Sequence, residues 1–203
     1  MVLVALAILF TGLLSLPACK KDEPAPEKKS RFSVAGQEFD LSKGYLLYWG
    51  LNSDSLSADW DVLLVSDGVY FSMDSVGGVG QALYMDLNVS SNSDLTPGTY
   101  TFANQRAAGT FVDASALVAY DFASDNGVEY YLNVAVPGGP IVVKKTGLDY
   151  EFEASFNANR DTAATNYPVT GYYKGRLNML DISMLRTSEK KEIKEKLAEF
   201  LSR

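Results

Sequence analysis

The 203-residue chain contains no histidine and only one cysteine. Without histidine there can be no Ser-His-Asp or Cys-His catalysis, no histidine general base and no histidine-ligated zinc. A single cysteine cannot form a disulfide within the chain, so the folded part has to be stabilised by its hydrophobic core. Walker-type phosphate loops and dinucleotide-binding glycine fingerprints are also missing. These absences exclude several common classes of enzyme, and we expect no cofactor and no metal site.

Charged residues are missing from positions 1–18, where the chain is apolar from Val2 to Leu16. The run is shorter than the roughly 20 residues that a membrane-spanning helix needs. It is typical of the apolar part of a secretory signal peptide, with Ala18 at the cleavage position. No Lys or Arg precedes the run, which leaves open a misassigned start codon or further residues upstream of Met1. A buried core helix is the alternative interpretation.

The residues Leu16-Pro17-Ala18-Cys19 resemble a bacterial lipobox. The resemblance implies that Cys19 becomes the first mature residue and carries lipid, and several acyl chains together anchor a protein firmly. The next residues, Lys20, Lys21, Asp22 and Glu23, resemble the export signal of Bacteroidetes lipoproteins that reach the outer face of the outer membrane. We therefore expect a lipid-anchored outer-membrane protein that is exposed on the cell surface.

The formal net charge is −7, and it stays at −7 without the uncharged residues 1–18. An acidic chain is repelled by the phosphates of nucleic acids, so we expect no nucleic-acid partner. The same charge argues against electrostatic binding to anionic lipid. The expected contact with the membrane is the N-terminal lipid alone.

Composition divides the chain into four parts. Residues 1–18 form the signal peptide. Residues 19–30 are polar and proline-containing, which predicts a flexible tether that extends to at most about 40 Å. Residues 31–180 form one β-domain. Residues 187–203 place Ile193, Leu197, Phe200 and Leu201 on one stripe, which predicts an amphipathic C-terminal helix. This helix either packs on the sheet or binds a partner.

Alternating polar and apolar residues dominate from residue 31 onward. In LDYEFEASF, the residues from Leu148 to Phe156 alternate between an apolar and a polar face, which is typical of a half-buried strand. ALYMDLNV predicts a second such strand, with Leu83, Met85 and its other odd-numbered residues on the apolar face. RFSVAGQEFDLS predicts a hairpin that turns at Ala35-Gly36. Turn residues recur about every ten positions, so we expect an all-β fold, an antiparallel β-sandwich or a barrel-like domain.

The segments FSVAGQEFDLSKGYLLYWG, GQALYMDLN, LTPGTYTF, IVVKKTGLDYEFEASF and VTGYYKGRL together resemble a group of uncharacterised Bacteroidetes surface lipoproteins. The resemblance covers most of residues 31–178 and rests on turn glycines and strand aromatics. It implies no catalytic residue. The C-terminal helix is outside the resemblance.

Carboxylates are the remaining candidates for catalysis, because two of them can serve a glycoside hydrolase. The candidates are Asp59, Asp61, Glu129, Glu151 and Glu153. Glu151 and Glu153 also fit the solvent-facing side of a strand, and that interpretation is the stronger one. A turn around Asp121 and Asp125 is rich in oxygen ligands but lacks the spacing of an EF-hand, so it predicts no calcium site.

Adjacent aromatic pairs and one further tryptophan are candidate ligand-binding residues, because exposed Tyr and Trp rings can stack on sugars. They are Tyr48, Trp49, Trp60, Tyr130, Tyr131, Tyr172 and Tyr173. Neighbouring strand residues point to opposite faces, so each pair should send one ring inward and one outward. A packing role for these rings is the alternative interpretation. Asp-Ser/Thr-apolar triplets make Ser55, Ser75 and Thr162 candidate sites of O-glycosylation, although surface turns explain them equally.

The sequence favours a non-catalytic role: binding of a glycan or peptide, or association with a larger surface assembly. Two alternatives stay open. One is a carboxylate-based glycoside hydrolase, and the other is a purely structural lipoprotein.

Overall fold

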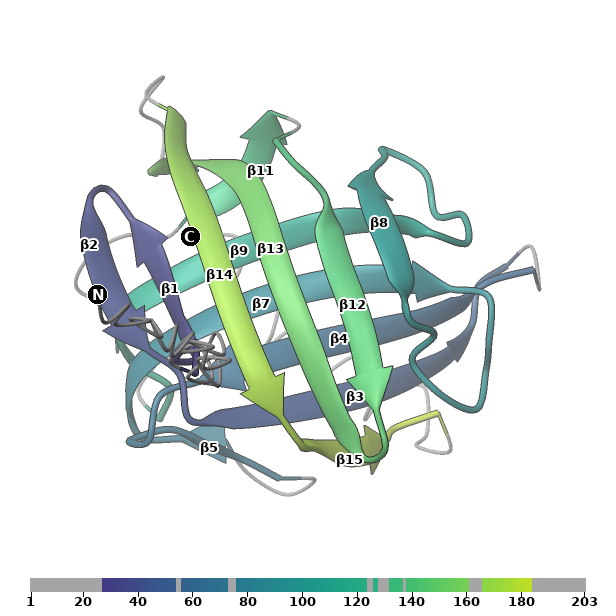
Figure 1. The fold of residues 1–203 in the computed structure, drawn as a ribbon, viewed down its shortest axis with the longest axis horizontal. Helices are drawn as coiled ribbons and strands as arrows, with labels where there is room; N and C mark the ends of the chain where they lie inside the picture. The colour runs from purple at the N-terminus through teal and green to yellow at the C-terminus, as the bar shows by residue number, and fades with distance from the viewer. Residues whose placement is uncertain are drawn as a thin grey trace, which may run out of the picture.

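The computed structural model describes residues 27–53, 56–72, 76–123, 126–127, 132–136, 138–160 and 166–183. These residues form fifteen β-strands and, within the described ranges, no helix (Figure 1). Accordingly, that part of the chain contains no helix with the length and hydropathy needed to cross a bilayer. The predicted helix at residues 187–203 lies outside the described residues.

The strands have the following bounds: β1 (Arg31–Val34), β2 (Gln37–Asp40), β3 (Lys43–Leu51), β4 (Ala58–Val65), β5 (Tyr70–Phe71), β6 (Val76–Gly77), β7 (Val79–Val89), β8 (Gly98–Phe102), β9 (Thr110–Asp121), β10 (Asn126–Gly127), β11 (Leu132–Val136), β12 (Ile141–Thr146), β13 (Asp149–Arg160), β14 (Asn166–Gly175) and β15 (Leu177–Asp181).

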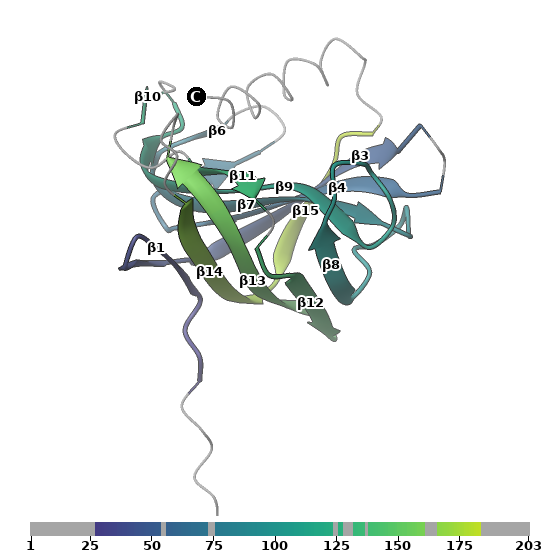
Figure 2. The same cartoon turned by 90° about the horizontal axis from the view of Figure 1, so that it is seen from above.

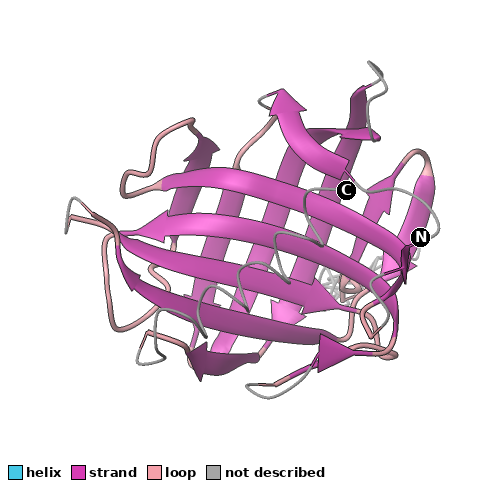
Figure 3. Cartoon of the chain, turned by 180° about the vertical axis from the view of Figure 1, so that it is seen from behind, coloured by secondary structure: helices cyan, strands magenta, loops and turns pink. Residues whose placement is uncertain are grey.

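Thirteen of these strands belong to one sheet, which curls into a half-barrel. Its order is β15-β3-β4-β7-β9-β8-β12-β13-β14-β1-β2, with β10 paired to β9 and β11 paired to both β9 and β13. Figures 1 and 3 show the result from opposite sides: β3, β4, β7 and β9 form one layer, and β12, β13, β14 and β1 cross it as the other. The two layers are also seen from above in Figure 2.

The predicted all-β class is confirmed, but the sheet is mixed and not purely antiparallel. β15 pairs with β3 in parallel, and β8 runs parallel to β9 over two residue pairs. The first parallel pair arises because the chain leaves β14 at Gly175 and crosses directly to the edge of the other layer. Local alternation does not reveal such a crossing.

The main core lies between the two layers. It joins Trp60, Met85 and Phe111 from one layer to Phe152 and Phe156 from the other. The apolar faces predicted for β7 and β13 both point into this core, and this part of the prediction is confirmed. Leu148 was expected on the same face, but it lies in the β12–β13 turn and is exposed.

A second apolar cluster covers the outer face of the β3–β4–β7–β9 layer. It includes Tyr45, Leu47, Leu63 and Tyr84. β4 is therefore buried along its whole length. A strand that is buried on both faces has a nearly continuous apolar sequence, as DVLLV does. The polar residues Asp59, Asp61, Asp86 and Asn88 on this outer face are buried as well.

The predicted hairpin at Ala35-Gly36 is confirmed by the antiparallel pairing of β1 and β2. Both turn residues have left-handed backbone conformations, with φ of 51° at Ala35 and 78° at Gly36. Two-residue hairpin turns of this kind favour Asn-Gly, because asparagine tolerates a positive φ better than alanine.

Replacing Ala35 by asparagine is expected to stabilise the domain by about 0.5–1 kcal/mol, because it relieves backbone strain in this turn. Urea unfolding should show a higher midpoint with an unchanged m-value. Ala35→Val is the matched control and should lower the midpoint, since a β-branched residue is poorly suited to a positive φ. A lower midpoint for Ala35→Asn would contradict the turn geometry.

Candidate functional site

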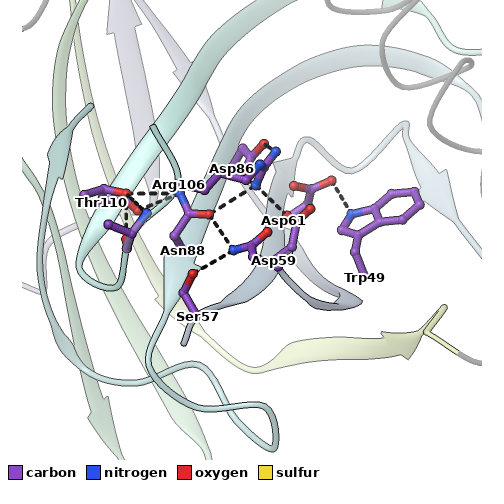
Figure 4. A network of polar contacts seen from close by, with 10 residues as sticks. Trp49, Ser57, Asp59, Asp61, Asp86, Asn88, Arg106 and Thr110 are labelled. Atoms are coloured by element: carbon purple, nitrogen blue, oxygen red, sulfur yellow. Dashed lines mark hydrogen bonds and ion pairs between the residues drawn. The ribbon is translucent and has the colours of Figure 1, made fainter. Parts of the chain in front are cut away.

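Three aspartates meet on the outer face of the β3–β4–β7–β9 layer (Figure 4). Asp59 and Asp61 belong to β4 and Asp86 belongs to β7. One carboxylate oxygen from each residue lies within 4.8 Å of the other two, and all three residues are buried. No other group of three acidic side chains in the described part of the chain is as close.

The register of two strands brings these carboxylates together. Asp61 is paired with Asp86, and Asp59 is paired with Asn88. Residues two apart in a strand share a face, so Asp59 and Asp61 project to the same side. Like charges directly opposite each other destabilise a strand pair. This arrangement therefore needs a positive charge beside it.

Arg106 supplies that charge from the loop between β8 and β9. Its Nη1 and Nη2 atoms donate to the two carboxylate oxygens of Asp86 at 2.8 and 2.6 Å, a bidentate contact. Nη1 also lies 3.1 Å from Oδ1 of Asp59 in an ion pair. Burial would lower the pKa of Arg106, but the hydrogen bonds and charge of Asp86 outweigh it and raise the pKa. The guanidinium therefore stays charged.

Asp61 is bound by neutral donors. Trp49 Nε1 donates to Asp61 Oδ2 at 2.6 Å, and the side chain of Tyr84 also hydrogen-bonds this carboxyl. Burial raises the pKa of Asp61 well above its ordinary value, and the charges of Asp86 and Asp59 raise it further. Burial likewise raises the pKa of Tyr84. Asp61 therefore holds a proton more readily than an ordinary aspartate does.

Amides and hydroxyls extend the network toward the β8–β9 loop. Asn88 Nδ2 donates to Thr110 Oγ1 at 3.1 Å, and Thr110 Oγ1 donates to the carbonyl oxygen of Ala107 at 2.7 Å. Asn52 Nδ2 donates to Asn88 Oδ1 at 3.1 Å and to Ser57 Oγ at 2.9 Å. Together these contacts attach the loop that carries Arg106 to the sheet.

In this cluster the guanidinium of Arg106 occupies the position beside the carboxylates that a metal cation would otherwise take. Carboxylate oxygens suit hard cations such as Ca²⁺, which takes six to eight oxygen ligands. Here the guanidinium of Arg106 already lies among the oxygens of Asp59, Asp86 and Asn88. Asp59, Asp61 and Asp86 would hold a metal ion only if the Arg106 side chain moved away from them.

The structure brings together two of the carboxylates that were candidates for catalysis and separates the others. Asp59 and Asp61 lie in the buried cluster, whereas Glu151 and Glu153 lie on β13, on the outer face of the other layer. Both glutamates form ion pairs with Lys144, at 3.3 and 3.0 Å. Glu129 lies outside the described residues.

Sequence reasoning missed Asp86 and Arg106, which complete the cluster. The sequence contains one signal for Asp86: in ALYMDLNV it alternates with Tyr84 and Asn88 on the face opposite the apolar one. Pairing that face with the DWD segment of β4 would have placed the acids side by side.

The candidate aromatics follow the predicted alternation, with one member of each described pair toward the core and one outward. Tyr48 packs against Trp60 in the core, with 4.7 Å between the ring centroids and 34° between the ring planes, and Tyr173 is buried there too. The outward members are Trp49, which is buried beside Asp61, and Tyr172. Trp60 is fully buried, whereas Tyr172 lines a surface pocket. Tyr130 and Tyr131 lie outside the described residues.

A shallow pocket of about 130 Å³ lies on the outer face of the other layer. β1, β2 and β14 contribute most of its lining, together with Lys28 from the segment that precedes β1. Its polar lining includes Arg31, Ser33, Glu38, Thr170 and Tyr172.

Several predicted positions lie outside the described residues. These are Cys19, the export-signal residues Lys20–Glu23, and the candidate glycosylation residues Ser55, Ser75 and Thr162.

Comparison of the chain with protein-family models, with curated proteins and with solved structures gives no match. Function has to be argued from the residues and geometry described above.

Proposed function

We propose that the protein is a lipid-anchored outer-membrane protein on the cell surface, and that its β-domain is a non-catalytic binding or accessory module. Its partner would be a glycan, a peptide or a component of a surface assembly. The anchor is supported by the LPAC box, with lipid on Cys19, and the location by the charged segment Lys20–Glu23. The resemblance to Bacteroidetes surface lipoproteins is part of the same proposal.

One observation carries the non-catalytic part: the clustered carboxylates already have partners. Arg106 binds Asp86 and Asp59, Trp49 donates to Asp61, and Lys144 pairs with the two glutamates of β13. A general acid and base must reach a substrate. Burial of all three aspartates leaves them little access to one.

A glycoside hydrolase remains the alternative, and the closeness of Asp59, Asp61 and Asp86 is what favours it. Retaining enzymes place two carboxyl groups about 5–5.5 Å apart around a substrate. The aspartates here approach that separation, but Arg106 lies between two of them and a glycosidic bond would have to displace it. We therefore place catalysis second, and a purely structural lipoprotein third.

Metabolic labelling with a palmitate analogue tests the anchor. The wild-type protein is expected to take up the label in a Bacteroidetes host, and Cys19→Ala is expected to lose it completely because no other thiol exists. Replacing Lys20–Glu23 by alanines is the matched control: the label should remain while digestion by protease on intact cells is lost. Label retained in Cys19→Ala would refute the anchor.

A further inference from the structure

We infer that the pocket formed by β1, β2 and β14 binds one ring of a neutral carbohydrate, stacked on the ring of Tyr172. The inference rests on the proposed binding function and names its ligand class and site. It is carried by four features of the pocket: an aromatic ring in contact with an exposed lysine, polar groups beside that ring, balanced charge and small size.

The first feature is the contact between the Tyr172 ring and the side chain of Lys28. Tyr172 points outward from β14 yet is only 8% exposed. Lys28 Nζ lies 4.1 Å from its ring centroid, and Lys28 is an exposed residue of the segment that precedes β1. An exposed cation–π contact is weak. A sugar ring that stacks on Tyr172 would have to displace the Lys28 side chain, which belongs to the segment before β1 and not to the sheet.

The second feature is the set of polar groups that the strand register places beside the ring. Arg31 is paired with Tyr172 across the sheet, and Ser33 is paired with Thr170. The hydroxyls of Ser33 and Thr170 lie 2.8 Å apart, and Arg31 Nη1 donates to a carboxylate oxygen of Glu38 at 2.5 Å. These groups offer hydrogen-bond donors and acceptors around one aromatic face, which matches sugar hydroxyls because each of them both donates and accepts.

The third feature is charge balance, which selects a neutral ligand over an anion. Arg31 is paired with Glu38, and Lys174 lies 3.7 Å from a carboxylate oxygen of Glu27. Glu153 lies close enough to Lys28 for the positive charge to lower the pKa of that carboxyl, after the larger effect of Lys144. The positive charges near the pocket thus have acidic neighbours, and a phosphate or carboxylate ligand would have to compete with them.

The fourth feature is size. The pocket has a volume of about 130 Å³, whereas sites for drug-sized ligands span roughly 300–1,000 Å³. A pocket this small and open accommodates one ring of a chain whose other units stay in solvent. We therefore expect weak binding of single sugars.

The test is saturation-transfer NMR on the detergent-solubilised full-length protein. The probes are the methyl glycosides of glucose, galactose, mannose, xylose and N-acetylglucosamine. At least one probe is expected to receive saturation from the wild-type protein. Tyr172→Ala should weaken its binding at least tenfold, whereas Tyr172→Phe, which keeps the ring, should stay within threefold. Tyr70→Ala is the matched control, because Tyr70 is an exposed tyrosine on β5, and should bind as the wild type does.

Unchanged binding by Tyr172→Ala, or no transfer to any probe from the wild type, would overturn the inference. Either result leaves the proposed function to be tested by separate experiments. These are the labelling of Cys19 and the capture of a partner from the cell surface. Should Tyr172→Ala melt below the assay temperature, Ser33→Val must show the same loss of binding. That substitution removes a single hydroxyl from the pocket and suits a strand.

Discussion

Replacing Arg106 by methionine is expected to lower the free energy of unfolding by about 2–3 kcal/mol at pH 7. Breaking a buried ion pair from one side typically costs about 3–5 kcal/mol, because the remaining charge stays buried without its partner. The Arg106 side chain is 34% exposed, so solvent screening places the expected loss below that range. Methionine keeps much of the apolar stem, which limits the change to the guanidinium. Urea unfolding at pH 7 measures the difference.

Two controls separate the charge of Arg106 from its packing. Arg31→Met removes an arginine from the pair with Glu38, whose side chain is exposed, and should cost no more than about 1 kcal/mol. Adding Asp86→Asn to the Arg106 variant should recover part of the loss, since the amide has no charge to bury. If Arg106→Met proves as stable as the wild type, the claim that Arg106 stabilises the buried aspartates is wrong.

Replacing Asp61 by asparagine is expected to stabilise the domain at pH 8 by about 1–4 kcal/mol. This range is the repulsion between two unit charges 4 Å apart in water and at an effective dielectric constant near 20. The asparagine oxygen still accepts from Trp49, but the side chain no longer ionises beside Asp86 and Asp59.

The direction in which stability changes with pH follows from the raised pKa of Asp61. The folded state holds this proton more tightly than the unfolded chain, whose carboxyl titrates near the ordinary value of 3.8. The protonated carboxyl therefore contributes stability that is fully present below pH 3.8 and is lost as the pH rises through the folded-state pKa.

Unfolding free energies between pH 4 and pH 8 test this assignment. The wild type should lose stability relative to Asp61→Asn as the pH rises. Glu38→Gln, which removes an exposed carboxyl at the β2 edge, is the control for loss of a carboxyl elsewhere on the sheet. A parallel pair of curves for wild type and Asp61→Asn would show that Asp61 does not titrate in this window.

Much of the fold could be predicted because it follows from local patterns. Strict alternation in β13 and β7 identified the residues that face the core, and Ala35-Gly36 identified a hairpin whose turn requires positive φ. The mixed character of the sheet could not be predicted in this way. The parallel pairing of β15 with β3 depends on a crossing between layers, which leaves no periodic signal in either segment.

Only part of the buried aspartate cluster could be predicted from the sequence. Asp59 and Asp61 were among five candidate carboxylates, but nothing in the sequence paired them with Asp86. The polar side of β7 looks solvent-facing, because alternation alone cannot show that the outer face of this strand is buried. Arg106 comes from a loop with no periodicity, and only the three-dimensional register brings it to Asp86. Alternation likewise predicted that one of Tyr48 and Trp49 faces outward, but not that it is Trp49 or that the outward ring is buried.

Mass spectrometry of the N-terminal peptide, from protein extracted from the membrane, tests the proposed anchored role most directly. We predict that the mature chain begins at Cys19 and that its sulfur carries a diacylglyceryl group in thioether linkage. A mature chain that begins at another residue, or a free thiol on Cys19, would contradict it.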